Sequence, residues 1–163
     1  MKLFISFFLL LLCGCYSAGN YPYAEEYLLR SKEKDVIAAI QYFKKANPAY
    51  CVPAHAGLRD GRSGDCSVWY RFDFYYPAEN KILYTWLRPA GEDRTTFALI
   101  AVNDGLTIGK WKDINRDFSS AENEQQKKLF EERILKKINF YLALKKEIAS
   151  SDSINSISSL YGH

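Results

Sequence analysis

The sequence contains few of the residues on which most catalytic centres depend. It has two histidines, His55 and His163, and four cysteines among its 163 residues. A C-x-x-C pair, a glycine-rich phosphate loop and an acidic calcium-binding loop are all missing, and these motifs mark redox or zinc sites, nucleotide sites and calcium sites. We therefore predict neither a metal site nor a cofactor.

An excess of charge of one sign is also missing. The formal net charge is +3, and the lysines and arginines are spread along the chain instead of gathering into a basic stripe. A dedicated nucleic-acid-binding protein carries such a stripe. We therefore predict that nucleic acid is not a partner.

The chain begins with an apolar run that is too short for a membrane-spanning helix, which needs about 20 residues. This run covers residues 3–12, follows Met1-Lys2 and ends in Leu12-Cys13-Gly14-Cys15. A positive start, a short apolar core and small residues at the end are typical of a cleaved export signal. The last four residues resemble the lipobox of the bacterial lipoproteins.

The resemblance implies a lipid anchor. In that family the lipobox cysteine is acylated and becomes the first residue of the mature chain, so Cys15 is the expected lipidation site and membrane lipid an expected partner. Acyl chains anchor strongly because each buried methylene contributes about 0.8 kcal/mol. Because Tyr16 is not Asp, the resemblance also implies the outer membrane, facing the periplasm. An ordinary secretory signal or a buried helix are the alternatives for this stretch.

These observations divide the chain into four parts. We expect a signal peptide over residues 1–14, a tether over residues 15–23, a single α+β domain over residues 24–149 and a disordered Ser-rich tail over residues 150–163. The third part has the length of one domain with one hydrophobic core.

Two cysteines remain after Cys15, and both leave the cytoplasm with the chain. An oxidising compartment lets Cys51 and Cys66 pair, and closing the loop between them contributes about 3 kcal/mol. We predict a disulfide between them. A metal or redox pair is the alternative, but it requires a second ligand set or a C-x-x-C spacing.

Hydrophobic periodicity predicts a helix near each end of the domain. Apolar residues at helical spacing indicate a helix over residues 32–46, after a short helical lead-in over residues 23–29. Ser119 and Glu122 form a capping box that starts a long helix, which we expect to end near Ala149.

Strands are predicted between the two helices. Apolar and polar residues alternate strictly over residues 66–76, and further strands are indicated over residues 81–88, 95–103 and 106–111, the last after an Asp-Gly hairpin signal. Short turns make these strands antiparallel. We predict an α+β fold with a three- to four-stranded antiparallel sheet, and with the N-terminal helix and the long C-terminal helix packed on one face.

The alternation also predicts a second face of the sheet, which we take as a candidate binding face. If Val68, Tyr70, Phe72 and Phe74 are in the core, the other face carries aromatic and charged side chains, a mixture typical of binding hot spots. Its members are Trp69, Arg71, Asp73, Tyr75, Tyr84 and Trp86. The alternative is that neighbouring loops or the N-terminal lead-in cover this face.

The long connection over residues 47–65 provides a second candidate site. It holds the densest set of chemically capable side chains, and we single out His55, Arg59, Asp60 and Arg62. Ser63 with His55 and Asp60 or Asp65 could form a triad, but no local signature such as G-x-S-x-G supports one. We predict no catalytic residue and interpret His55 as a solvent-facing loop residue.

Together the patterns favour a binding role over catalysis. We predict a lipid-anchored protein of the cell envelope, of non-catalytic binding type, with a protein or a cell-wall or glycan component as partner. A periplasmic immunity-type lipoprotein that inhibits a toxin is one alternative, and a small envelope hydrolase is the other.

Overall fold

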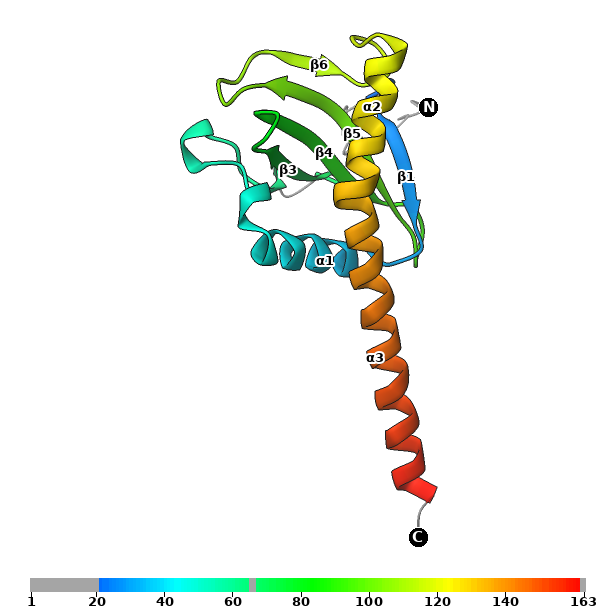
Figure 1. The fold of residues 1–163 in the computed structure, drawn as a ribbon. Helices are drawn as coiled ribbons and strands as arrows, with labels where there is room; N and C mark the ends of the chain where they lie inside the picture. Colours follow the sequence, from blue (N-terminus) through cyan, green and yellow to red (C-terminus); the bar gives the residue numbers. More distant parts are fainter. Residues whose placement is uncertain (1–20, 65–66, 162–163) are drawn as a thin grey trace, which may run out of the picture.

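The computed structural model describes residues 21–64 and 67–161, with side chains as far as residue 150. The predicted signal, the lipobox with Cys15, and Asp65 and Cys66 lie outside these residues. The described chain has an antiparallel sheet of six strands and a long C-terminal helix (Figure 1). The predicted α+β class is confirmed, but the sheet is larger than the three or four strands expected.

The sheet is built around its longest strand, β5. The strand order is β1-β5-β4-β3-β2, with β6 also paired to β5. Because β4 occupies one edge of β5, β1 and β6 share the other edge, opposite residues 95–99 and 101–103 respectively. The bounds are β1 Glu25–Leu29, β2 Gly61–Arg62, β3 Tyr70–Tyr76, β4 Lys81–Pro89, β5 Thr95–Asp104 and β6 Trp111–Asp113.

Strand β1 corrects the expectation of a helical lead-in over residues 23–29. Its residues pair with β5 from Glu25 opposite Leu99 to Leu29 opposite Thr95. Tyr27 and Leu29 face inward while Leu28 is 58% exposed, so the burial alternates as in a strand. The local sequence is short and ambiguous, and the unpaired edge of β5 decides its conformation.

The connection between β5 and β6 also differs from the expected two-residue hairpin. The strand predicted over residues 106–111 is shorter and later, because β6 begins only at Trp111. The buried amide of Asn103 holds the intervening loop: its Nδ2 donates to the carbonyls of Gly105 (2.9 Å) and Thr107 (3.0 Å), and its Oδ1 accepts the N–H of Lys110 (2.8 Å). The Asn103 side chain thus holds this loop in place of the backbone hydrogen bonds that the expected hairpin would form.

The connection over residues 47–65 is more ordered than a free loop. It contains two 3₁₀ turns, η1 (Pro48–Tyr50) and η2 (Ala54–Ala56), and strand β2. An isolated bridge also joins Cys51 to Phe74 of β3. The connection is therefore joined to the edge of β3 at two points, at Cys51 and at β2.

Helix α1 (Glu33–Ala46) covers the residues expected to be helical near the start of the domain. Val36, Ile40 and Phe43 are all at most 1% exposed and form its inner face. The backbone beyond it is turned by Asn47, whose side chain donates to the carbonyl of Phe43 (2.8 Å). This helix lies crosswise to the long C-terminal helix (Figure 1).

The C-terminal helical element consists of α2 (Ser120–Phe130), a π-helical turn η3 (Glu131–Leu135) and α3 (Lys136–Tyr161). The predicted capping box is confirmed, since Ser119 Oγ accepts the N–H of Glu122 and the Glu122 carboxylate accepts the N–H of Ser119 (3.1 Å). The element continues to Tyr161, so helix replaces the disordered tail expected from residue 150. Helix propagation adds a backbone hydrogen bond per residue and outweighs the weak propensity of the serines.

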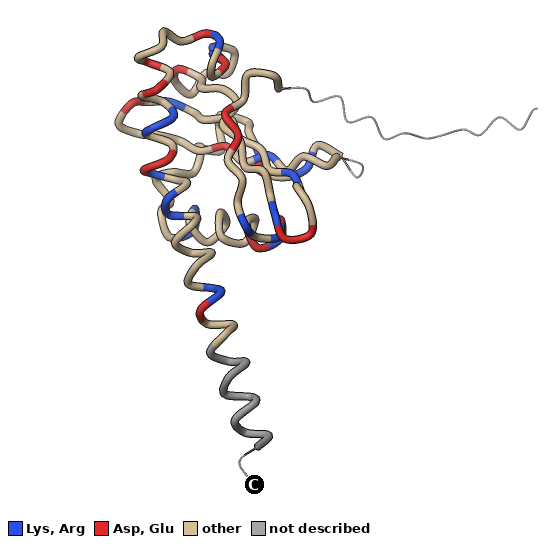
Figure 2. The backbone as a smooth tube through the Cα atoms, turned by 90° about the vertical axis from the view of Figure 1, so that its right-hand side faces the viewer, with Lys and Arg blue, Asp and Glu red and all other residues tan. Residues whose placement is uncertain are grey.

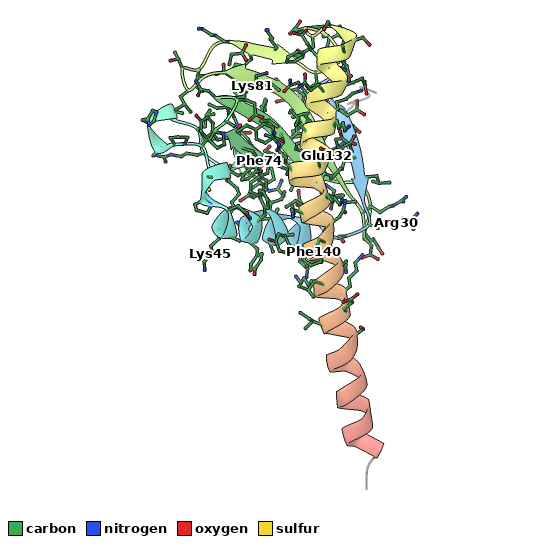
Figure 3. The ribbon with its side chains drawn as sticks, in the orientation of Figure 1. Arg30, Lys45, Phe74, Lys81, Glu132 and Phe140 are labelled. Atoms are coloured by element: carbon green, nitrogen blue, oxygen red, sulfur yellow. The ribbon has the colours of Figure 1, made fainter. Side chains whose placement is uncertain are left out.

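The main core lies between the sheet and the helices. It joins residues of every large element, among them Phe74, Phe97, Phe130 and Ile134, none of which is exposed to solvent. Phe74 points into this layer while Arg30 and Lys45 point away from the fold (Figure 3). Basic and acidic residues are interspersed along the chain (Figure 2). No helix within the described residues is long and apolar enough to cross a membrane.

Candidate functional site

The predicted binding face is not an open surface. Asp73 is 1% and Trp86 2% exposed, whereas the other four members, Trp69, Arg71, Tyr75 and Tyr84, are half-buried. Val68 was expected in the core and is 49% exposed instead, because β3 begins only at Tyr70 and the chain before it leaves the sheet. The face therefore has a buried centre and a partly accessible border.

Tyr21 covers part of this face. Its hydroxyl lies 2.7 Å from the hydroxyl of Tyr84, and its ring centroid lies 6.3 Å from that of Trp69 and 6.1 Å from that of Trp86. The alternative of a covered face is thus correct for this part, although Tyr21 precedes the lead-in over residues 23–29. Tyr21 belongs to the expected tether over residues 15–23, and yet it packs on the sheet.

The accessible border of the face and the residues 59–63 and 67 enclose a cleft of about 670 Å³. We call it the Trp–Arg cleft, after the aromatic and basic residues that dominate its lining. It is lined by Tyr21, Arg59, Asp60, Gly61, Arg62, Ser63, Ser67, Trp69, Arg71, Tyr84 and Trp86. Both predicted sites contribute to it, because pairing of β2 with β3 brings the loop to the edge of the sheet.

Two predicted residues lie outside the cleft. Tyr75 donates its hydroxyl hydrogen to Asn80 Oδ1 (2.9 Å), beside the turn between β3 and β4. His55 is exposed on η2 and makes no side-chain hydrogen bond within the described part of the chain. The structure therefore brings neither Ser63 nor Asp60 to His55 as a triad requires.

A chain of charged groups supports one wall of the cleft. Arg71 donates to both carboxylate oxygens of Asp73, at 2.8 and 3.0 Å. Asp60 accepts the backbone N–H of Asp73 (3.0 Å) and pairs with Lys44 Nζ (2.5 Å), which also donates to the carbonyl of Asp73 (2.9 Å). Burial raises the pKa of Asp73, and the hydrogen bonds from Arg71 oppose that rise. Asp73 thus serves to orient Arg71 toward the cleft.

Arg62 is also held in place by hydrogen bonds to protein groups. Its Nη2 pairs with Glu33 of α1 (2.5 Å) and its Nη1 donates to the carbonyl of Ser67 (2.9 Å). Its guanidinium carbon lies 5.6 Å from the ring centroid of Tyr70, and that of Arg71 lies 4.3 Å from the ring of Tyr84. Cation–π attraction to these rings holds both guanidinium groups in place, in addition to their hydrogen bonds.

The aromatic wall of the cleft consists of two tryptophans in contact. The ring centroids of Trp69 and Trp86 lie 4.0 Å apart at an interplanar angle of 63°, and the guanidinium carbon of Arg88 lies 4.8 Å from the Trp69 ring. Both indole Nε1 atoms are buried and have no hydrogen-bond acceptor within the described residues. A buried N–H without an acceptor costs about 1–3 kcal/mol, so such groups call for a functional explanation.

Two other hollows differ in chemistry. One of about 460 Å³ lies between α1 and the connection that follows it, and its lining includes Lys44, Lys45 and Cys51. A groove of about 510 Å³ lies between α1 and α3 and is lined mainly by apolar side chains, including Tyr42, Leu142 and Leu144. In the described part of the chain no three His, Cys, Asp or Glu side chains come close enough together to hold a metal ion. The Trp–Arg cleft is therefore the site with the richest polar chemistry among the described residues.

Sequence patterns did not indicate two of the residues that build the cleft. Tyr21 is separated from Tyr84 by 63 positions, and Glu33 is separated from Arg62 by 29. The sequence around Glu33 predicts the exposed start of a helix. The sequence around Tyr21 predicts a tether outside the domain. No local signal could have identified either contact.

Comparison of the chain with known proteins identifies no relative. No protein-family model, no curated protein and no solved structure matches it at a significant level. The functional argument therefore depends on the residues and geometry described above.

Proposed function

We propose that this chain is a lipid-anchored, non-catalytic binding protein of the cell envelope, and that it binds a cell-wall or glycan component in the Trp–Arg cleft. The observation that carries the proposal is the cleft itself: about 670 Å³ lined by aromatic rings and oriented guanidinium groups. Binding sites for small ligands are concave, of comparable volume, and combine apolar walls with a few placed polar groups.

The burial of the sheet face favours a glycan over a flat protein partner. A stable protein interface buries about 1,200–2,000 Å² in total, and the centre of the predicted face, at Asp73 and Trp86, is closed to solvent. A cleft of this size instead accepts a narrow ligand, such as a glycan chain. Half-exposed Trp69 offers such a ligand an aromatic surface at the cleft wall.

The tether limits where the protein acts. If Cys15 is acylated, residues 15–21 span at most about 25 Å when extended, and Tyr21 is already packed at the cleft. The cleft would then lie near the membrane surface, where envelope components attached to or passing close to the membrane are within reach.

A sedimentation experiment tests the binding role. Purified full-length protein in detergent is mixed with insoluble cell-wall sacculi and centrifuged, and we expect it to pellet with the sacculi. Trp69→Ala should remain in the supernatant, whereas Tyr42→Ala, which removes an exposed aromatic side chain outside the cleft, should pellet normally. Failure of the unmodified protein to pellet, together with inhibition of a periplasmic toxin, would support the immunity-type alternative instead.

The anchor is tested separately by Cys15→Ser. Without the thiol no acyl chain can be attached, so the variant should leave the membrane fraction as soluble or unprocessed protein. Mass spectrometry of the unmodified protein should find the acyl mass on an N-terminal peptide that begins at Cys15. A Cys15→Ser variant that stays in the membrane in processed form would refute the lipobox interpretation.

A further inference from the structure

The charges lining the Trp–Arg cleft are unbalanced. Its three arginines face a single carboxylate, that of Asp60. Both oxygens of Asp60 are already occupied, one by Lys44 Nζ and the other by the backbone N–H of Asp73. Arg62 and Arg71 are paired with Glu33 and Asp73, which lie outside the lining. The unbalanced positive charge of the cleft is therefore that of Arg59, and it favours an anionic ligand.

Two of the arginines are positioned by protein groups alone. A guanidinium group has five N–H donors. Arg71 uses two of them on Asp73, and Arg62 uses one on Glu33 and one on Ser67, so each keeps unused donors. A planar cation with a fixed orientation and spare donors suits the paired oxygens of a carboxylate or a phosphate. Such preorganisation also lowers the entropy lost on binding.

The third arginine, Arg59, is not held by a carboxylate of the described residues. Arg59 is exposed and makes no ion pair with any described residue. It lines the same cleft as Arg62 and Arg71. Its guanidinium can therefore bind an anion without first breaking an internal contact.

The two tryptophans of the cleft wall require a ligand that has an apolar surface as well as a negative charge. Trp86 is 2% exposed and Trp69 half-buried, and the indole N–H of each has no acceptor among the described residues. A bare inorganic anion would leave the Trp69 ring uncovered, and a purely apolar ligand would leave Arg59 without an anionic partner. A sugar ring has an apolar C–H face for the indole and hydroxyl oxygens that accept hydrogen bonds.

We propose that the Trp–Arg cleft binds an acidic sugar, with its carboxylate or phosphate on Arg59, Arg62 and Arg71 and its ring against Trp69. This inference rests on the proposed function and specifies the ligand class for the same cleft. Uronic acids and sugar phosphates share the required chemistry, an oxyanion attached to a ring.

Calorimetric titration of the full-length protein in detergent tests the inference. The probes are a glucuronic acid oligosaccharide, a hexose phosphate, a neutral glucose oligosaccharide and inorganic phosphate. We expect one or both acidic sugars to bind at least about tenfold more tightly than the neutral sugar and the inorganic phosphate. Their affinity should fall as the salt concentration rises, because salt screens the guanidinium charges.

Arg59→Gln is the decisive variant, because removing Arg71 would strand the buried carboxylate of Asp73 and could unfold the domain. It should weaken acidic-sugar binding about tenfold, while Arg30→Gln, which removes the same charge on an exposed residue beyond the far edge of the sheet, should not. Two results would overturn the inference and leave the proposed function standing when they occur together: equal affinity for neutral and acidic sugars, and no change of affinity in Arg59→Gln.

The inference would also be overturned if inorganic phosphate bound as tightly as hexose phosphate, or if no sugar bound. Sedimentation with sacculi decides the proposed function independently.

Discussion

The hydroxyl oxygens of Tyr21 and Tyr84 lie 2.7 Å apart and join the start of the described chain to the middle of strand β4. The two rings meet edge to face, with centroids 5.9 Å apart. Tyr84 also contacts Trp111 of β6 and lies under the guanidinium of Arg71. Both tyrosines line the Trp–Arg cleft, and Tyr21 links the expected membrane tether to it.

The tyrosine pair should behave as one energetic unit. Tyr21→Phe and Tyr84→Phe each remove one side of the same hydrogen bond, so each should lower the free energy of unfolding by about 1 kcal/mol. In a double-mutant cycle measured by urea denaturation, the double variant should lose less than the sum of the single losses. Tyr23→Phe, whose exposed ring makes no hydroxyl hydrogen bond within the described residues, is the control. Strict additivity would mean that the two hydroxyls do not interact in solution.

The two tryptophans of the cleft wall should differ in their effect on stability. Trp86 is 2% exposed, so Trp86→Ala should cost about 3–5 kcal/mol, as should Phe72→Ala in the main core. Trp69 is half-buried, and Trp69→Ala should cost about 1–2 kcal/mol while abolishing pelleting with sacculi. Chemical denaturation measures all three. If Trp69→Ala destabilises as much as Phe72→Ala, then Trp69 is a core residue, and its loss of binding carries no information about a ligand.

Stability should fall at alkaline pH. Burial raises the pKa of Tyr76 and of Tyr84 above the usual value of about 10, and burial together with the Glu131 carboxylate does the same for Tyr27. Below pH 10 these groups are protonated in both states, so their contribution is complete. As the pH rises above about 10, only the unfolded chain ionises and the free energy of unfolding falls.

The buried Tyr76 sets the size of this effect. It is 1% exposed, and it should contribute a slope of up to about 1.4 kcal/mol per pH unit, whereas the half-exposed Tyr27 and Tyr84 contribute less because solvent screens them. Urea denaturation at pH 8, 9, 10 and 11 measures the slope. Tyr76→Phe should flatten the profile, and Tyr42→Phe, at a tyrosine that is 59% exposed, should not. An unchanged slope in Tyr76→Phe would show that other groups control the alkaline limit.

The Cys51–Cys66 disulfide remains a prediction, because Cys66 lies outside the described residues. Cys51 itself is half-buried beside α1, with its Sγ 3.6 Å from the carbonyl of Lys44. Protein isolated from an oxidising periplasm should contain no reactive thiol and expose two after reduction, with a loss of about 2–4 kcal/mol in stability. Cys51→Ser should then release one reactive thiol, that of Cys66. Two reactive thiols in the untreated protein would rule out the bridge.

The sequence by itself determined the elements whose periodicity is strong and local. The alternation around Phe72 and Phe74 marks β3, the apolar spacing through Val36 and Ile40 marks α1, and the Ser119 capping box marks the start of α2. Each of these signals arises from neighbours within a few positions, where the period of the backbone decides which side chains share a face. The same alternation correctly grouped Trp69, Arg71 and Asp73 on the second face, where Trp86 of β4 lies opposite Arg71.

Only the tertiary structure decided what covers that face and where it remains open. Residues 25–29 became a strand because the edge of β5 needed a partner, and Asn103 replaced the expected hairpin through hydrogen bonds that span seven positions. The cleft joins Tyr21, residues 59–63 and strand β4, which are far apart along the chain. Contacts of this kind depend on the packing of whole elements, and no local periodicity encodes them.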